Sequence, residues 1–212
     1  IATANRFTAV VHTSTTSLMI TDAVKQAEQA NKVVFLDETC TGWEGCPRNK
    51  YGRTKLEAER RCCHHSSVNR LPVVILRTSR FFPEDVIVDA ENREAACSGS
   101  SSCEGGSAPT EDAYVTTPNL KANELLGRRV ALADLVDAHL RAILHAPTIG
   151  VGGAVFTLSA PSPFCRDDIP RLEKDARSLI LEKFPMASEL YQKRGWLLPE
   201  AGSIRVYESH KA

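Results

Sequence analysis

Two residues four positions apart, Tyr51 and Lys55, are the strongest candidates for chemistry in this 212-residue sequence. They stand in the segment YGRTK, and a spacing of four places two side chains on one face of a helix, within contact distance. An ammonium group beside a phenol favours the phenolate, which is the form that a general base for a substrate hydroxyl requires. The pair therefore predicts proton transfer to or from a hydroxyl group.

A run of hydroxyl side chains could hold that substrate. Ser14, Thr15 and Thr16 follow the apolar segment 8–13 (TAVVHT), which is typical of a buried strand. We expect this strand to lie beside the helix of Tyr51, so that one hydroxyl holds the substrate oxygen while the tyrosine moves the proton. Hydroxyl, tyrosine and lysine together suit hydride exchange between a carbinol carbon and a nicotinamide.

The spacing alone is not specific, because Tyr207 and Lys211 match it as well. Tyr51 follows a hydroxyl-ended strand and the turn-rich stretch 41–49, and a helical pattern and the apolar run 73–76 (VVIL) come after it. Tyr207 has no predicted strand after it. Context thus favours Tyr51, although the residues by themselves leave open that this is an ordinary exposed helix pair.

The surrounding elements predict an α/β fold. The run 73–76 is typical of a central parallel strand, and the order strand, helix, strand implies a right-handed crossover. Two amphipathic helices are expected later, the first capped by Asp134 and the second opened by Asp167 or Asp168. The apolar face predicted for the first helix consists of Val136, Leu140, Ile143 and Leu144. The face predicted for the second consists of Ile169, Leu172, Ala176, Leu179 and Ile180.

Residues 89–119 break the pattern, since Ser, Gly, Glu and Ala dominate them, and they predict a mobile surface insertion. We expect Cys97 and Cys103 within it not to form a structural disulfide. Seven cysteines at irregular spacing, without a secretion signal, favour free thiols and a cytoplasmic location. The run 62–65 (CCHH) predicts no metal site, because consecutive helical residues point about 100° apart.

Composition excludes two classes of partner. The 26 Lys and Arg residues balance the 26 Asp and Glu residues, and nucleic-acid binding would need a strong basic excess. No apolar run approaches the roughly 18 residues that a membrane span requires. The expected partner is a small-molecule substrate, with neither nucleic acid nor membrane.

Several segments in order, TSTTSLM, YGRTKLEAE, ILRTSRFFPED, NELLGRRVALADLVDAHL, GWLLPE and RVY, resemble the extended short-chain dehydrogenase/reductases. Within them the chain is most similar to the NAD-dependent epimerase/dehydratase group, relatives of the UDP-sugar epimerases. The resemblance implies a partial Rossmann-like, doubly wound parallel sheet with a small α/β substrate-binding part, and a homodimer as one form of assembly. Residues 1–88 would hold the Tyr-x-x-x-Lys helix, 89–119 the insertion, and 120–212 a remaining strand and the substrate-binding part.

The resemblance also implies roles at the cofactor, NAD or NADP. Tyr51 would be the catalytic acid/base, and Lys55 would bind the nicotinamide ribose and favour the phenolate. Thr15 would be the catalytic hydroxyl. Ser14, Tyr51, Lys55 and Ser79 would contact the cofactor.

Other matching positions would contact the substrate: Thr16, Arg80, Arg128 and Arg129. Arg128 or Arg129 would meet a diphosphate, since arginine suits phosphate oxygens. Their spacing to Asp134 is shorter than in sugar-nucleotide epimerases, which is a departure from the family pattern.

A larger departure is the lack of a glycine-rich turn between a first strand and helix. The glycines of 150–153 follow a helix and precede a strand, which is the reverse order. We therefore expect the chain to begin just before the fifth strand of the family, without its dinucleotide-binding half. The predicted function is an NAD(P)-dependent oxidoreductase or epimerase acting on a carbinol carbon, such as one of a nucleotide sugar. The alternatives are a non-catalytic binding or scaffold relative, or an incomplete fragment without activity of its own.

Overall fold

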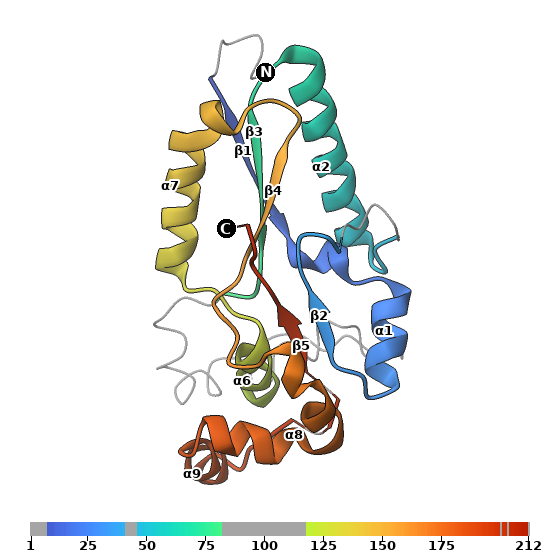
Figure 1. Cartoon of the computed structure of the whole chain (residues 1–212), viewed down its shortest axis with the longest axis vertical. Coiled ribbons are helices and arrows are strands. Elements are labelled where there is room, and N and C mark those ends of the chain that lie inside the picture. Colours follow the sequence, from blue (N-terminus) through green and yellow to red (C-terminus); the bar gives the residue numbers. More distant parts are fainter. Residues whose placement is uncertain (1–7, 41–45, 82–117, 200, 203, 212) are drawn as a thin grey trace, which may run out of the picture.

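The computed structural model describes residues 8–40, 46–81, 118–199, 201–202 and 204–211. Within them lie two parallel sheets (Figure 1). The larger sheet has the order β1 (Val10–Thr15), β3 (Val73–Thr78), β4 (Ala154–Leu158). The smaller sheet pairs β2 (Val34–Leu36) with β5 (Arg205–Tyr207). The predicted α/β fold with a parallel sheet is confirmed.

Two helices cover opposite faces of the larger sheet. Side chains alternate between faces along a strand, and in β3 Leu76 packs in the cluster that includes α7 (Leu132–Ile149). Its neighbour Arg77 pairs instead with Glu59 of α2 (Lys50–Asn69). Figure 1 shows the two helices on either side of the strands. Since β1, β3 and β4 follow one another across the sheet, the crossovers through α2 and α7 have opposite hands.

The apolar face predicted for α7 is wrong. Leu135, Ala142 and Ala146 of this helix are buried against the sheet. The four residues expected there are exposed, with Leu144 at 73%. The helix carries two apolar stripes, and the stripe with two alanines lies on the sheet because small side chains let a helix approach it closely.

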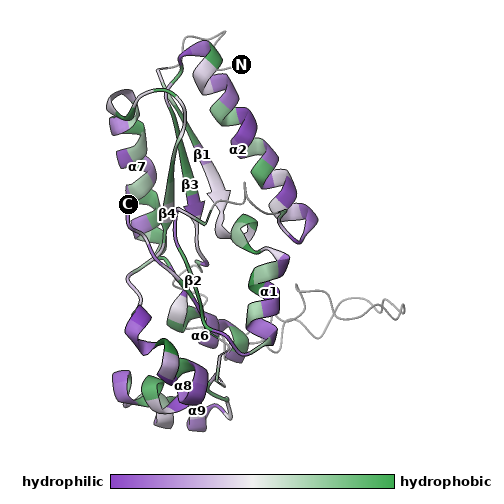
Figure 2. Ribbon diagram, turned by 45° about the vertical axis from the view of Figure 1, so that its right-hand side comes forward, coloured by the Kyte–Doolittle hydropathy of each residue, from purple (hydrophilic) through white to green (hydrophobic). Residues whose placement is uncertain are grey.

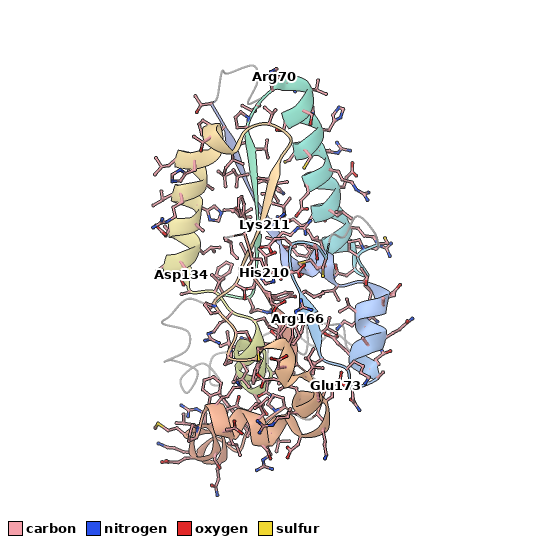
Figure 3. The ribbon with its side chains drawn as sticks, viewed as in Figure 1. Arg70, Asp134, Arg166, Glu173, His210 and Lys211 are labelled. Atoms are coloured by element: carbon pink, nitrogen blue, oxygen red, sulfur yellow. The ribbon has the colours of Figure 1, made fainter. Side chains whose placement is uncertain are left out.

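Asp134 is not the cap of α7. The N-cap position is Ala131, and its side chain makes no capping bond. Asp134 lies in the first turn, where a carboxylate still interacts favourably with the helix dipole. Figure 3 shows Asp134 at the end of α7 where the helix begins.

The smaller sheet packs against α8 (Ile169–Lys183), and the buried face predicted for α8 is confirmed. Leu172, Ala176, Leu179 and Ile180 of α8 are buried, and Val206 of β5 lies in the same cluster. The remaining elements are α1 (Asp22–Gln29), α6 (Pro118–Gly127), α9 (Ala187–Lys193) and the 3-10 turns η1 (Thr16–Met19) and η2 (Arg166–Asp168). Figure 2 shows hydrophobic residues along much of β3 and hydrophilic ones on the outer side of α2.

Hydrogen bonds join the two sheets at the outer edge of β4. The buried Glu38, just after β2, accepts from the backbone N of Thr157 at 3.0 Å and of His210 at 3.2 Å. The backbone N of Ser159 donates to the Ser209 hydroxyl. Segments that follow β2 and β5 are thereby fixed to the larger sheet.

The prediction of a mobile insertion over 89–119 falls largely outside the described residues, as do Cys97 and Cys103. Its last two residues belong to α6, which begins at Pro118. In the described part, Cys40, Cys46, Cys62, Cys63 and Cys165 have free thiols, as expected. That part also contains no helix with the length and apolar character needed to cross a membrane.

Candidate active site

Tyr51 and Lys55 lie in the first two turns of α2. The Asn49 side chain begins this helix by accepting from the backbone N of Gly52 at 2.6 Å. Tyr51 is 54% exposed, and the Lys55 ammonium lies 5.9 Å from the centre of its ring. The predicted shared face is therefore present. Lys55 Nζ also donates to the backbone oxygen of Thr13 at 3.2 Å, which ties the helix to β1.

Gly52 is a residue of this site that sequence reasoning missed. A Cβ there would lie 2.9 Å from Pro47 Cβ and 3.2 Å from the backbone oxygen of Ser17. A larger residue would push the start of α2 away from η1. The sequence signal was the glycine directly after Tyr51, within the helix itself.

The three hydroxyl residues at the end of β1 have different partners. Ser14 Oγ donates to Glu59 Oε1 at 2.5 Å, and Thr16 Oγ1 donates to the backbone oxygen of Thr78 at 3.3 Å. Thr15 Oγ1 accepts from the backbone N of Ser17 at 3.1 Å. Because a hydroxyl can donate as well as accept, and Thr15 Oγ1 only accepts among the described residues, its O–H can donate to a substrate oxygen. The Ser14 hydroxyl instead donates its hydrogen to Glu59 of α2.

The end of β3 contributes Ser79 and Arg80. The backbone N of Ser79 donates to Leu158 O at 2.9 Å, while its buried Oγ has no hydrogen-bond partner among the described residues. A buried polar atom without a partner is the kind of group that a ligand satisfies. Arg80 Nε lies 2.9 Å from Glu124 Oε2, so this side chain is directed at α6.

Tyr207, the second tyrosine with a lysine four positions on, is not part of a helical pair. It lies in β5, and Lys211 follows in non-helical chain (Figure 3). The phenol is buried, with its oxygen 3.5 Å from Arg205 Nη1. Burial raises the pKa of Tyr207, but nearby Arg205 and Arg128 and a hydrogen bond with Thr16 outweigh burial and lower it.

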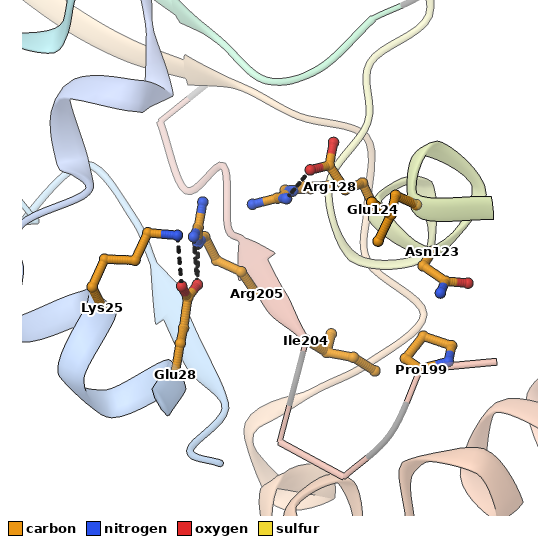
Figure 4. Close-up of a pocket in the computed structure, with 9 residues that line it drawn as sticks. Lys25, Glu28, Asn123, Glu124, Arg128, Pro199, Ile204 and Arg205 are labelled. Atoms are coloured by element: carbon orange, nitrogen blue, oxygen red, sulfur yellow. Dashed lines mark hydrogen bonds and ion pairs between the residues drawn. The ribbon is translucent and has the colours of Figure 1, made fainter. Parts of the chain in front are cut away.

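A cavity of about 310 Å³ lies between α1, α6 and β5 (Figure 4). Glu28 of α1 pairs there with Arg205 at 2.5 Å and with Lys25 at 3.2 Å. Glu124 of α6 pairs with Arg128 at 2.5 Å. Two carboxylates thus neutralise much of the positive charge, and an anionic ligand would have to compete with them.

The two adjacent arginines predicted to bind substrate, Arg128 and Arg129, have different positions relative to this cavity. Arg128 lines the cavity, together with Glu124. Arg129 does not line it, and its Nη1 donates to Leu125 O at 2.9 Å. Sequence reasoning missed Glu28 and Arg205 because they are 177 positions apart and no local spacing connects them.

A second charged cluster contains Asp37, Glu208 and His210, whose side-chain oxygen and nitrogen atoms lie within 4.8 Å of one another. The Arg166 guanidinium lies 2.5 Å from Glu208 and 3.5 Å from Asp37. Figure 3 shows Arg166 and His210, which come from distant parts of the sequence. An arginine therefore already supplies the positive charge between these carboxylates.

Comparison with known proteins adds a family match. Residues 1–100, which include Thr15, Tyr51 and Lys55, match the model of an NAD-binding family described as "Male sterility protein". This description differs from that of the epimerase/dehydratase group that the sequence most resembles. No curated protein matches the chain.

Solved structures are similar at low identity. One is UDP-N-acetylglucosamine 4-epimerase from Bacillus cereus, at 12% identity and a TM-score of 0.44 over 81% of this chain and 50% of that one. Another is RMD from Pseudomonas aeruginosa, complexed with NADPH, at 17% identity and a TM-score of 0.48 over 98% of this chain and 59% of that one. The chain thus spans between half and three fifths of their lengths.

The family match and the residues at the start of α2 agree. The matched family binds NAD, so NAD or NADP is its class of cofactor. The parallel sheet and the Tyr51–Lys55 face are those that the resemblance implies. Residues 1–100 of the 212-residue chain are thus similar to an NAD-binding family.

Proposed function

We propose that this chain supplies the catalytic side chains of an NAD(P)-dependent oxidoreductase or epimerase that acts on a carbinol carbon. The observation that carries the proposal is the face shared by Tyr51 and Lys55, tied to β1 through Thr13 just before Thr15. A phenol, an ammonium group and a free hydroxyl at one edge of a parallel sheet suit proton transfer at a substrate alcohol.

Each side chain has a role in this reaction. Thr15 donates its O–H to the substrate oxygen and orients it. Tyr51 takes the hydroxyl proton as the carbinol carbon gives up hydride, and returns it in the reverse direction. Lys55 places a positive charge beside the phenol ring. The nicotinamide, when bound, accepts or returns the hydride.

The residues present fit the nicotinamide side of a cofactor. Lys55 uses one of its three N–H donors on Thr13, which leaves donors for ribose hydroxyls. Ser79 offers a buried oxygen without a partner in the described part. For the cofactor phosphates no such fit is present, since the 212 residues contain no glycine-rich strand-to-helix turn.

For the substrate we propose the cavity beside β5, and a nucleotide sugar as its occupant. Thr16 hydrogen-bonds Tyr207, and the Tyr207 oxygen lies 3.5 Å from Nη1 of Arg205, which lines the cavity. Arg128 lines the cavity and suits a diphosphate. In this binding mode the diphosphate replaces Glu124 as the partner of Arg128.

The test uses the full-length gene product. NADH and NADPH binding is measured by fluorescence, and NAD(P)⁺ reduction is measured with UDP-N-acetylglucosamine and a panel of simple secondary alcohols. Tyr51→Phe should lower turnover by a factor on the order of 10² to 10⁴ and leave the dissociation constant for NADH nearly unchanged. Lys55→Ala should impair both.

Ser67→Ala is the matched control, because it removes an exposed hydroxyl four turns further along α2. Tyr207→Phe does not serve as one, since Tyr207 is buried between Thr16 and Arg205. If the full-length product binds neither NADH nor NADPH, the oxidoreductase proposal is wrong and the scaffold alternative stands. If Tyr51→Phe keeps full turnover, the active site lies elsewhere.

A further inference from the structure

A fully buried ion pair lies on the α2 side of the larger sheet. Arg77 of β3 and Glu59 of α2 have no exposed side-chain surface. Arg77 Nη2 donates to Glu59 Oε2 at 2.8 Å and Arg77 Nε to Glu59 Oε1 at 3.1 Å. Two parallel bonds of this kind fix the relative orientation of both side chains.

Ser14 is the third member of this network. Its hydroxyl donates to Glu59 Oε1 at 2.5 Å. Ser14 and Arg77 are also direct neighbours in the register of β1 and β3. One carboxylate of α2 therefore holds two adjacent strands, at the residue directly before Thr15.

The network continues the catalytic face of α2. Tyr51, Lys55 and Glu59 follow one another at intervals of four, which places them along one side of the helix. Lys55 bonds to the backbone of Thr13, and Glu59 bonds to the side chain of Ser14. The helix is thus attached to β1 at two consecutive residues immediately before Thr15.

Stability alone is a poor explanation for these charges. Replacing a buried ion pair by apolar residues of similar volume is often neutral or stabilising. Arg77 Nη1, moreover, has no hydrogen-bond partner among the residues that the structure describes. Apolar side chains would fill the space but would offer no acceptor to Ser14 and no directional bond.

We propose that Glu59 is a positioning residue for the active site. Through Ser14 and Arg77 it fixes how the Tyr51–Lys55 face of α2 stands relative to Thr15 at the end of β1. Glu59 itself touches neither substrate nor cofactor. This inference rests on the proposed function for its catalytic consequence, but its structural part can be measured separately.

The test compares Ser14→Ala and the double variant Glu59→Leu/Arg77→Met with the full-length wild-type protein. The position of Thr15 is read from hydrogen exchange of the Ser17 amide, which donates to Thr15 Oγ1. We expect this exchange to become about tenfold faster in both variants. The Glu208 amide, which donates to Leu36 O in the smaller sheet, should keep its rate and serves as the control for global unfolding.

Turnover with whichever alcohol of the panel the wild type oxidises should fall at least tenfold in the double variant. Its thermal midpoint, its KM and its dissociation constant for NADH should stay close to the wild-type values. Unchanged Ser17 exchange in Ser14→Ala would overturn the inference, even if the double variant does not fold. Full turnover in the double variant would overturn it too, since the pair would then act only in packing.

Turnover of Tyr51→Phe and of the two network variants distinguishes a wrong role for Glu59 from a wrong active site. If Tyr51→Phe loses turnover while both network variants keep it, only the role of Glu59 is wrong. If Tyr51→Phe keeps turnover, the proposed active site is wrong, whatever Ser17 exchange shows.

Discussion

Asp168 shows how a single carboxylate makes the stability of this chain depend on pH. Its Oδ2 accepts from the backbone N of Cys165 at 3.0 Å and lies 3.1 Å from Lys183 Nζ. The Cys165 bond, followed by the contact with Lys183, holds the pKa of Asp168 below its ordinary value. A lowered pKa in the folded state stabilises the protein above the unfolded value of about 3.9, and this stabilisation is lost as pH falls through the folded pKa.

We therefore expect Asp168→Asn to lower the free energy of unfolding at neutral pH by on the order of 1 kcal/mol, as for other capping carboxylates. The difference from wild type should shrink as pH falls below the ordinary value of about 3.9 and through the lowered folded pKa, where the wild-type carboxyl becomes protonated. Urea unfolding at a series of pH values measures it. Asp167→Asn, at an exposed neighbour, is the control. A difference that is constant with pH would contradict the assignment.

For single side chains, the sequence predicted those contacts whose two partners lie close together along the chain. Tyr51 and Lys55 share a helix turn, so their spacing alone places them on one face. The hydrogen bond of Ser14 to Glu59 could not be predicted in this way, because Glu59 and its partner Arg77 come from other elements. Its predicted contact with the cofactor stays a prediction, and the structure directs its hydroxyl at Glu59.

Helix α7 has large apolar side chains on its exposed face as well as on the face that it buries. Leu135 faces the sheet, whereas Leu144 is 73% exposed on the same helix. Truncating a buried leucine to alanine costs about 2–5 kcal/mol, and a surface change usually stays within about 0.5 kcal/mol. Leu135→Ala should therefore destabilise strongly in urea unfolding, and Leu144→Ala hardly at all. Equal losses would mean that Leu144 is covered in solution.

Sequence periodicity could not choose between the two stripes of α7. Both recur at helical spacing, and larger side chains suggest the stripe with Leu140, Ile143 and Leu144. The choice is made by β3 and β4, whose side chains leave room for Ala142 and Ala146. In α8, where one stripe is clearly more apolar, the prediction was confirmed.

The turn before β5 depends on Gly202. Its φ is +72°, and a Cβ would lie 1.9 Å from the backbone oxygen of Asn31. Gly195 has a φ of +64° with open space around it. Gly195→Ala should cost about 1–2 kcal/mol from the left-handed backbone alone. Gly202→Ala should cost clearly more, since backbone must move, and a thermal melt of both variants compares them.

For the whole molecule, we predict that the 212-residue chain alone does not bind NAD(H) or NADP(H) usefully. The glycine-rich turn and the helix N-terminus behind it supply much of the affinity for a dinucleotide, and the sequence lacks that turn. Titration of NADH fluorescence against the chain measures this. A dissociation constant in the low micromolar range would show that the cofactor site has been misplaced.

The order of elements in the larger sheet was predictable, whereas the smaller sheet was not. Strand β3 and helix α2 are marked by composition and periodicity in the sequence. Strands β2 and β5 have three residues each, and their pairing joins Val34 to Arg205. The sequence predicts a brief extended piece at Val33 to Leu36, where β2 lies, but the pairing of two such short strands over this separation leaves no local signal.

The long stretch of chain between α1 and β5 also determines the order in which parts of the structure can form during folding. The walls of the cavity include Glu28 and Arg205, 177 positions apart, so the cavity cannot exist until β5 has been made and docked. Contacts between distant residues form slowly, because a long loop must close before they contribute. β1 and β3 pair over a much shorter stretch of chain and need not wait. A ligand of this cavity would therefore bind only molecules in which β5 has docked. By binding them it would shift the folding equilibrium from late intermediates toward the native state.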